Sequence, residues 1–174
     1  RGGRAFVNRK QLTSQLRAHL PYTLTHAQVR AIREIVQDMA SPRRMHRLLQ
    51  GDVGAGKTIV AVFSALLALE NGAQVALMAP TELLAEQHAR SIGTLLAPLG
   101  ITPVLLTGRL GAREKRAALA QLATREPLLV IGPHALLQDG VQFADLGLVI
   151  IDAQHRFGVE QRAALGNKGH TVAV

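Results

Sequence analysis

GDVGAGKT, at residues Gly51 to Thr58, decides the fold class of this chain. The stretch fits the pattern G-x-x-x-x-G-K-[ST], a glycine-rich turn that follows a β-strand and opens a helix. The apolar run His46–Gln50 precedes it, and a helix-forming stretch, Lys57–Glu70, follows it. A match to the letters alone arises about once in a hundred chains of this length at average residue frequencies. The strand and the helix on either side make a chance turn the weaker interpretation.

The loop has the chemistry of phosphate binding. Glycines let its backbone curl so that successive N–H groups point at phosphate oxygens, and the positive N-terminal end of the next helix strengthens the attraction. Lys57 would reach the β and γ phosphates of ATP, and the Thr58 hydroxyl would bind Mg²⁺. The predicted nucleotide-binding residues of this loop are Gly51, Asp52, Val53, Gly54, Ala55, Gly56, Lys57 and Thr58.

Short apolar runs alternate with longer amphipathic runs along the chain, which is typical of a parallel sheet covered by helices. Helical spacing covers residues 8–19 and 25–40, with Thr25 as the N-cap of the second helix. The predicted strands are His46–Gln50, Gln74–Ala79, Thr102–Leu106, Leu128–Ile131, Leu148–Ile151 and Thr171–Val174. The other predicted helices are Lys57–Glu70, Thr81–Leu96, Gly111–Thr124 and Val159–Leu165. We therefore predict an α/β fold of the phosphate-loop type, a doubly wound parallel sheet with helices on both faces.

Length and composition narrow the class of protein. A chain of 174 residues with 48% hydrophobic and 18% charged residues suits one folded domain, which we place at residues 8–174 after a flexible start at 1–7. The chain has no cysteine, and its seven histidines lack H-E-x-x-H spacing, which argues against disulfides and structural zinc. No apolar run reaches the roughly 18 residues that a membrane span needs. We expect a soluble, cytoplasmic protein without a membrane partner.

The net charge of +8 favours attraction to a polyanion, most commonly nucleic acid. One Tyr, four Phe and no Trp offer little platform for stacking unpaired bases, so contacts should be mainly with phosphates. Two basic clusters either belong to that surface or are plain solvated faces. Their residues are Arg43, Arg44 and Arg47 in the first, and Arg113, Lys115 and Arg116 in the second.

The apolar run LGLVIID ends in Asp152, where a phosphate-loop ATPase keeps the carboxylate that holds its metal. An aspartate that only caps the following turn is the alternative. The next position normally carries the carboxylate that deprotonates the attacking water, and here it is Ala153. Loss of a general base typically lowers the rate about 10²- to 10⁴-fold. We therefore predict a chain that binds ATP and Mg²⁺ but hydrolyses ATP poorly.

Four segments together resemble RecG, the bacterial branched-DNA helicase family of superfamily 2. They are LTHAQ (Leu24–Gln28), MHRLLQGDVGAGKT (Met45–Thr58), MAPTELLAEQH (Met78–His88) and IIDAQHRFGV (Ile150–Val159). The resemblance runs from about Phe6 onward and implies a RecA-like motor lobe. The motor of the transcription-repair coupling factor is similar but usually reads E-Q-R-F-G-V where this chain has QHRFGV, so RecG is favoured over that alternative.

The resemblance also assigns roles to residues outside the phosphate loop. Gln28 would read the edge of adenine, although a polar residue on an exposed helix face is the alternative. His155 matches the histidine that links the nucleotide site to the domain interface in this family, with plain packing as the alternative. The residues implied to touch the DNA backbone are Pro80, Thr81, Glu82, Thr107, Gly108, Arg109 and His134. Thr81 could serve as a helix N-cap at the same time.

The chain departs from the family pattern in two places. Gly132–Leu137 reads GPHALL where the family has G-T-H-A-L-L, so Pro133 removes a hydroxyl and an N–H from a phosphate contact. Proline suits the first turn of a helix, so the fold should tolerate this change. The second departure is Ala153, since the family has D-E-Q-H rather than D-A-Q-H.

As a whole, the resemblance implies ATP-driven translocation on double-stranded DNA by a monomer, which remodels stalled forks and branched DNA in repair and recombination. In a bacterium this activity would be cytoplasmic, at the nucleoid. A wedge domain would precede this lobe, and a second lobe with an arginine finger would follow it. A DNA-binding module that responds to nucleotide without a motor role is the alternative that Ala153 favours. A small-molecule kinase shares the phosphate loop but leaves MAPTELLAEQH and DAQH unexplained.

Overall fold

Six parallel strands form one sheet in the computed structural model, which describes residues 5–41, 46–48, 55–138, 141–152 and 170–173. The strands are β1 (His46–Leu48), β2 (Gln74–Ala79), β3 (Val104–Leu105), β4 (Leu129–Pro133), β5 (Leu146–Ile151) and β6 (His170–Ala173). They lie in the order β1-β6-β5-β2-β4-β3, and every neighbouring pair is parallel. The predicted parallel sheet is confirmed.

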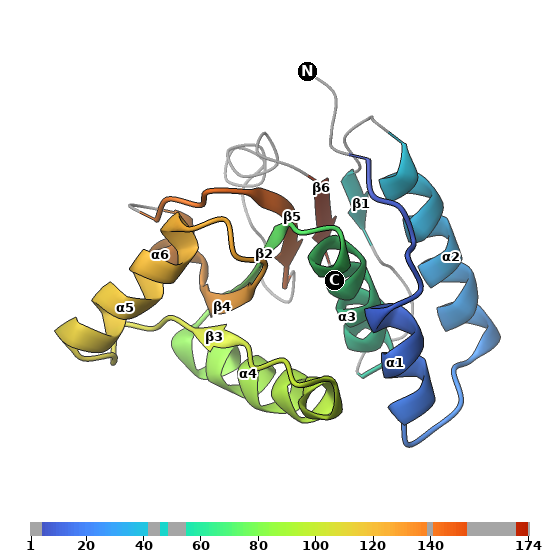
Figure 1. The fold of residues 1–174 in the computed structure, drawn as a ribbon. Helices are drawn as coiled ribbons and strands as arrows, with labels where there is room; N and C mark the ends of the chain where they lie inside the picture. The colour runs from blue at the N-terminus through green and yellow to red at the C-terminus, as the bar shows by residue number, and fades with distance from the viewer. Residues whose placement is uncertain (1–4, 42–45, 49–54, 139–140, 153–169, 174) are drawn as a thin grey trace.

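Helices cover both faces of the sheet. They are α1 (Leu12–His19), α2 (His26–Ala40), α3 (Ala55–Glu70), α4 (Glu82–Leu96), α5 (Ala112–Ala123) and α6 (His134–Gln138), with a 3-10 turn, η1, at Ala97–Leu99. Figure 1 shows α1 and α2, in blue, at one side of the molecule and α5 and α6, in yellow and orange, at the other. The doubly wound arrangement is therefore confirmed as well.

Burial on β2 explains why the sheet needs helices on both faces. Every residue of this strand is buried, and successive side chains point to opposite faces of a sheet. Val75, Leu77 and Ala79 join the core that α1 to α4 cover. Ala76 and Met78 join a second core with residues of α5 and α6. A continuous apolar strand is expected where parallel strands are covered twice.

The predicted flexible start at 1–7 is wrong for its last residues. The Phe6 side chain is fully buried, and its N–H donates to the Met39 carbonyl at 2.7 Å. The backbone of Val7 is bonded to the Asn71 side chain through both its N–H and its carbonyl. A buried aromatic ring and these bonds hold this segment against α2 and the end of α3.

Helix α1 begins at Leu12 rather than at residue 8. The Glu70 carboxylate accepts from the N–H groups of Arg9 and Leu12, at 2.7 and 3.0 Å, and this fixes a turn ahead of the helix. Lys10 adopts a positive φ of 53° within that turn, which a helix does not permit.

Pro133 ends a strand, whereas the sequence places it in the first turn of a helix. It pairs with Ala79 of β2, and α6 begins at the next residue. A missing N–H is tolerated at the end of a strand, where the hydrogen-bond ladder stops. The sequence predicted a first helical turn at Pro133 but no bounds for the short helix α6, and the predicted helix Val159–Leu165 lies outside the described residues. Among the described helices, none has the length and apolar character to cross a membrane.

Gln74, at the amino end of β2, ties three elements together from a fully buried position. Its Nε2 donates to the carbonyls of Leu122 and Thr124 at 3.0 and 2.7 Å, and its Oε1 accepts from the Asp145 N–H at 3.0 Å. These bonds satisfy backbone groups at the end of α5 and at the end of the loop that leads into β5, and they join both segments to β2. The residue lies at the opposite end of the sheet from Pro80 and Asp152, which follow the carboxyl ends of β2 and β5.

Gln74→Leu should destabilise the chain by about 2–4 kcal/mol, because each buried backbone group left without a partner costs about 1–3 kcal/mol. Urea unfolding followed by circular dichroism measures the loss. Gln121→Leu, at an exposed position on α5, is the control and should change little. An unfolding midpoint for Gln74→Leu equal to that of the wild type would show that these bonds do not stabilise the fold.

Candidate functional site

The predicted site residues gather at one edge of the sheet, where its parallel strands end. Asp152 follows β5, Pro80 follows β2, and His134 follows β4. Ile151 pairs with Met78, and the Asp152 N–H donates to the Met78 carbonyl at 2.9 Å, so β5 and β2 end side by side. Open parallel α/β sheets bind their ligands at the carboxyl ends of the strands. The polar residues Asp152 and His134 therefore lie at the edge of the sheet where a ligand is expected to bind.

Gln28 lies against the first turn of α3, the helix that follows the predicted phosphate loop. Its Nε2 donates to the Gly56 carbonyl at 3.4 Å. Its Oε1 accepts from the Thr25 N–H at 2.8 Å, and its own N–H donates to Thr25 Oγ1 at 3.1 Å, which completes a capping box. A primary amide has two N–H groups and two lone pairs on oxygen, so this pattern leaves capacity for a further partner. The predicted N-cap at Thr25 is confirmed.

Lys57 and Thr58 stand in the first turn of α3, and both are half-buried. Ala55 is the first residue of this helix. The predicted site residues Gly51, Asp52, Val53, Gly54, Ala153 and His155 lie outside the described residues. For the phosphate loop, the structure therefore describes the end that carries the lysine and the hydroxyl.

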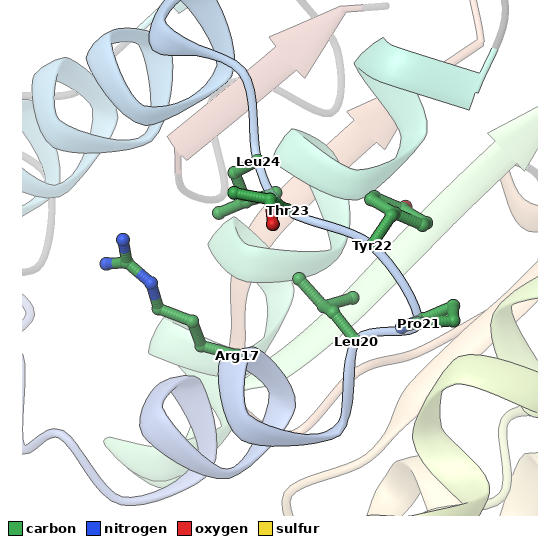
Figure 2. A pocket seen from close by; sticks show the side chains of 6 residues that line it. All are labelled: Arg17, Leu20, Pro21, Tyr22, Thr23 and Leu24. Carbon is green, nitrogen blue, oxygen red and sulfur yellow. The ribbon is translucent and has the colours of Figure 1, made fainter.

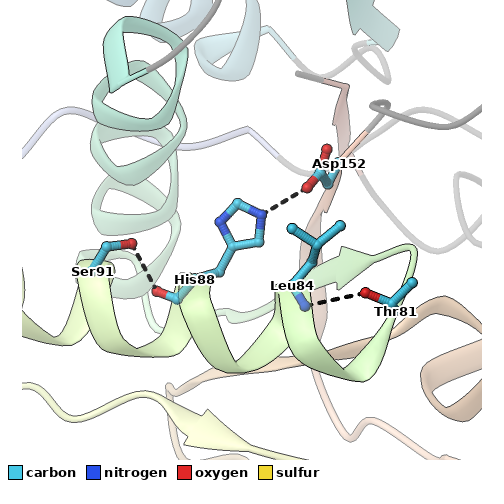
Figure 3. A network of polar contacts seen from close by, with 5 residues as sticks. All are labelled: Thr81, Leu84, His88, Ser91 and Asp152. Atoms are coloured by element: carbon cyan, nitrogen blue, oxygen red, sulfur yellow. Dashed lines mark hydrogen bonds and ion pairs between the residues drawn. The ribbon is translucent and has the colours of Figure 1, made fainter.

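Asp152 is a buried carboxylate with a partner that sequence reasoning missed. Its exposed fraction is 2%, and His88 Nε2 lies 2.7 Å from its Oδ2. Figure 3 shows the imidazole of His88 on α4 directed at the carboxylate at the end of β5. Because an ionised carboxylate only accepts, the Nε2–H of His88 is the donor. The last letter of MAPTELLAEQH was the only signal in the sequence, and nothing there connects it to a residue 64 positions away.

The donor chemistry of the site fits Mg²⁺. Thr58 offers a hydroxyl and Asp152 a carboxylate, and hard divalent cations prefer oxygen ligands. Among the described residues, no group of three or more His, Asp or Glu side chains could hold a metal by itself. Mg²⁺ commonly binds through one or two protein oxygens together with substrate phosphates, which matches this sparse set.

Two of the segments predicted to touch DNA lie side by side. The N–H of Gly108 donates to Glu82 Oε2 at the start of α4, and Arg109 Nη1 lies 3.6 Å from Glu86 Oε2 one turn later. Gly108 and Arg109 are exposed, whereas Thr107 is buried. The structure therefore joins these segments into one surface, to which Thr107 contributes no exposed side chain.

Thr81 is an N-cap, as the sequence allowed. Its Oγ1 accepts from the Leu84 N–H at 3.2 Å at the start of α4. The side chain is exposed, so the cap leaves the hydroxyl accessible to other partners. His134, the last residue predicted to touch DNA, is 7% exposed at the start of α6.

Gly132 explains why the GPHALL segment begins with glycine. A Cβ at this position would lie 2.5 Å from the Leu106 carbonyl oxygen and 3.3 Å from Leu137 Cγ. The backbone that leaves β3 therefore passes close to the end of β4, and only glycine leaves room for it. This contact brings the segment that begins at Thr107 toward the same edge.

A hollow of about 410 Å³ lies on the connection between α1 and α2. Figure 2 shows its lining, with Arg17 at the end of α1 and the other side chains along the connection. The lining residues are Arg17, Leu20, Pro21, Tyr22, Thr23 and Leu24. The hollow lies shortly before Gln28 in the chain but includes none of the predicted site residues.

Residues 25–171 match the DEAD/DEAH box helicase family. Over 158 residues the chain is 52% identical to the ATP-dependent DNA helicase RecG of Pasteurella multocida, and over 150 residues it is 53% identical to RecG of Bacillus subtilis. These alignments cover 91% and 86% of this chain. The chain spans only 23% and 22% of the lengths of those relatives, so it corresponds to one part of them.

The fold is similar to that of solved helicases. A structure of RecG bound to a three-way DNA junction superposes with a TM-score of 0.88 at 42% identity, covering 99% of this chain and 23% of that one. The helicase MrfA superposes at a TM-score of 0.69 with 14% identity, covering 92% of this chain and 28% of that one, which shows a shared fold alone.

Proposed function

Because the chain belongs to the DEAD/DEAH box helicase family, we propose that it is the ATP-binding motor lobe of a RecG-like DNA helicase. One observation supports this proposal: Asp152 is buried at the carboxyl end of β5, and Gln28 donates to Gly56 in the first turn of α3, as expected of a helicase nucleotide site. The similarity to RecG supports the choice of helicase.

Each described residue of the site has a role in this proposal. The Lys57 ammonium binds the β and γ phosphates, and the helix start behind it favours negative charge. The Gln28 amide forms hydrogen bonds to the edge of adenine with the donor and acceptor positions that remain. Its bond to Gly56 keeps the adenine-binding residue next to the helix that binds the phosphates. Thr58 and Asp152 hold Mg²⁺, which when bound neutralises the charge of the phosphates.

Hydrolysis should be poor, because Ala153 cannot accept the proton of an attacking water. In the helicases that the chain resembles, an arginine finger from a second lobe also stabilises the transition state. Such a finger is worth about 10³- to 10⁵-fold in turnover. The 174-residue chain by itself should therefore hold ATP far better than it splits ATP.

DNA contact is proposed for the surface formed by the start of α4 and the TGR segment, Thr107–Arg109. Thr81 presents an exposed hydroxyl at a helix start, and Arg109 presents a guanidinium on the same surface; both groups suit phosphate. Glu82 repels phosphate by its charge, so we assign it to holding Gly108 in place rather than to DNA contact. In the full-length helicase, this surface would serve the remodelling of forks and branched DNA.

A second candidate, a DNA-binding module that responds to nucleotide without hydrolysing it, is favoured by Ala153 alone. Both candidates predict that nucleotide and DNA influence each other's binding, since a coupling between two sites is reciprocal. A basic surface that binds DNA without regard to nucleotide predicts no such influence.

The test is to titrate a labelled three-way DNA junction with the chain at two salt concentrations, with and without an unhydrolysable ATP analogue and Mg²⁺. We expect the analogue to change DNA affinity about 5- to 150-fold, the usual range of coupling between sites, and salt to weaken binding through the phosphate contacts. Arg109→Ala should reduce the salt dependence, whereas Arg30→Ala, at an exposed position on α2, should not. A DNA affinity that is the same with and without the analogue, at both salt concentrations, would contradict the motor-lobe proposal.

A further inference from the structure

His88 contacts the buried carboxylate of Asp152 from α4. It lies on α4 between Ala85 and Ile92, two buried residues three and four positions away, so it belongs to the face of the helix that packs on the sheet. An apolar side chain would suit that face. The residue there is instead an imidazole with a donor 2.7 Å from Asp152 Oδ2, and its side chain is 19% exposed (Figure 3).

A buried carboxylate needs a partner, and His88 supplies one from a rigid element. Burying an unpaired charge is costly, so Asp152, at 2% exposure, requires donors. The backbone N–H of Asp152 donates to the Met78 carbonyl in the sheet, and this bond fixes the main chain of the residue. The imidazole of His88 holds Oδ2 of its side chain. A carboxylate has about four acceptor sites, so it can accept from His88 and bind a cation at the same time.

We propose that His88 is a positioning residue that orients the Asp152 carboxylate toward the Mg²⁺ of a bound nucleotide. This inference rests on the proposed function, because it requires Asp152 to be a metal-side residue. It adds a residue that the phosphate-loop pattern does not contain. Partners that hold a metal-binding carboxylate in place typically contribute about 10- to 100-fold to metal affinity. His88 is therefore expected to act on the Mg²⁺-dependent part of nucleotide affinity and not on nucleotide affinity in general.

The experiment measures the dissociation constant of a fluorescent, unhydrolysable ATP analogue in Mg²⁺ and in excess EDTA. The ratio of the two constants isolates the contribution of the metal. For His88→Ala we expect this ratio to fall about 10- to 100-fold, with the constant in EDTA unchanged. His88→Gln, which keeps an N–H donor at a similar reach, should recover part of the ratio. Gln87→Ala, at the exposed neighbouring position, should keep the ratio of the wild type.

Two further measurements keep the inference open to disproof. His88→Leu, which keeps volume but has no donor, replaces His88→Ala if the smaller side chain unfolds the chain. In the unmutated chain bound to the analogue, addition of Mg²⁺ should shift the Nε2 resonance of His88 in a nitrogen NMR spectrum. An unshifted resonance, or a ratio in His88→Leu equal to that of the wild type, would mean that His88 only satisfies a buried charge.

The failure of the inference can be told apart from the failure of the proposed function. If Mg²⁺ strengthens binding of the analogue to the wild type, and Lys57→Ala does not bind the analogue in Mg²⁺ or in EDTA, the nucleotide site is supported whether or not His88 contributes. If the wild type shows no response to Mg²⁺, Asp152 is not a metal-side residue, and both proposals are overturned.

Discussion

Lys57→Ala should weaken binding of an unhydrolysable ATP analogue at least about a hundredfold, since two charge-assisted hydrogen bonds to phosphate are each worth about 1.5–3 kcal/mol. The lysine is half-buried in the first turn of α3, and we expect its ammonium to reach the phosphates from there. Alanine keeps the helix, because it has the highest helix propensity. A fluorescence titration with Mg²⁺ present measures the change.

The matched control for this variant is Lys115→Ala. Lys115 is also a half-buried lysine in the first turn of a helix, α5, but that helix lies on the other face of the sheet. Its replacement should leave nucleotide affinity unchanged. If Lys57→Ala and Lys115→Ala bind the ATP analogue with equal affinity, the phosphate loop is not part of the nucleotide-binding site.

Ala153→Glu should raise the rate of ATP hydrolysis about 10²- to 10⁴-fold over that of the unmodified chain, the usual contribution of a positioned general base. The glutamate would follow Asp152 directly, at the place where the helicases that this chain resembles carry their base. The absolute rate should remain low, because an arginine finger from a second lobe would be missing in an assay of the chain alone. Release of phosphate under saturating Mg²⁺–ATP is the measurement.

Two companion variants test the reason for this gain. Ala153→Gln is close to glutamate in size but cannot accept the proton, so it should not raise the rate. Lys57→Ala combined with Ala153→Glu should return the rate to that of the unmodified chain. A gain that survives the loss of Lys57, or one that glutamine reproduces, would show that the activity arises elsewhere.

The sheet and its coverage could be predicted because their signals are local. The run Gln74–Ala79 is apolar after its first residue and has helical spacing on either side, which is typical of a strand buried on both faces. The carboxyl ends of parallel strands share one edge, so the sequence predicts that Asp152 lies at the same edge as the start of α3.

The features that the sequence missed depend on contacts between distant residues. The start of α1 is set by Glu70, 58 positions away from Leu12. The partner of Asp152 comes from a helix 64 positions earlier. No periodicity in the sequence shows such a pair. Helical spacing at residues 8–11 therefore led to a predicted helix that starts too early, where Glu70 imposes a turn. Tertiary contacts decided these cases against local propensity.

The predicted DNA residues illustrate an intermediate case. The sequence could name Glu82 and Gly108 through resemblance, but it could not show that one side chain accepts from the backbone of the other. It could not show that Thr107 is buried next to exposed Arg109 either. The structure thus separates the predicted DNA residues into an exposed surface, which includes Arg109, and the Glu82 carboxylate, which holds the backbone of that surface in place.

The most direct test of the nucleotide site is an amide NMR titration of the unmodified chain with the unhydrolysable ATP analogue and Mg²⁺. We predict that the resonances of Gly56, Lys57, Thr58 and Asp152 shift and saturate at one nucleotide per chain, while those around Gln74, at the other end of the sheet, stay in place. Shifts confined to the hollow between α1 and α2, with Lys57 and Asp152 unaffected, would contradict the assignment of this edge as the ATP site.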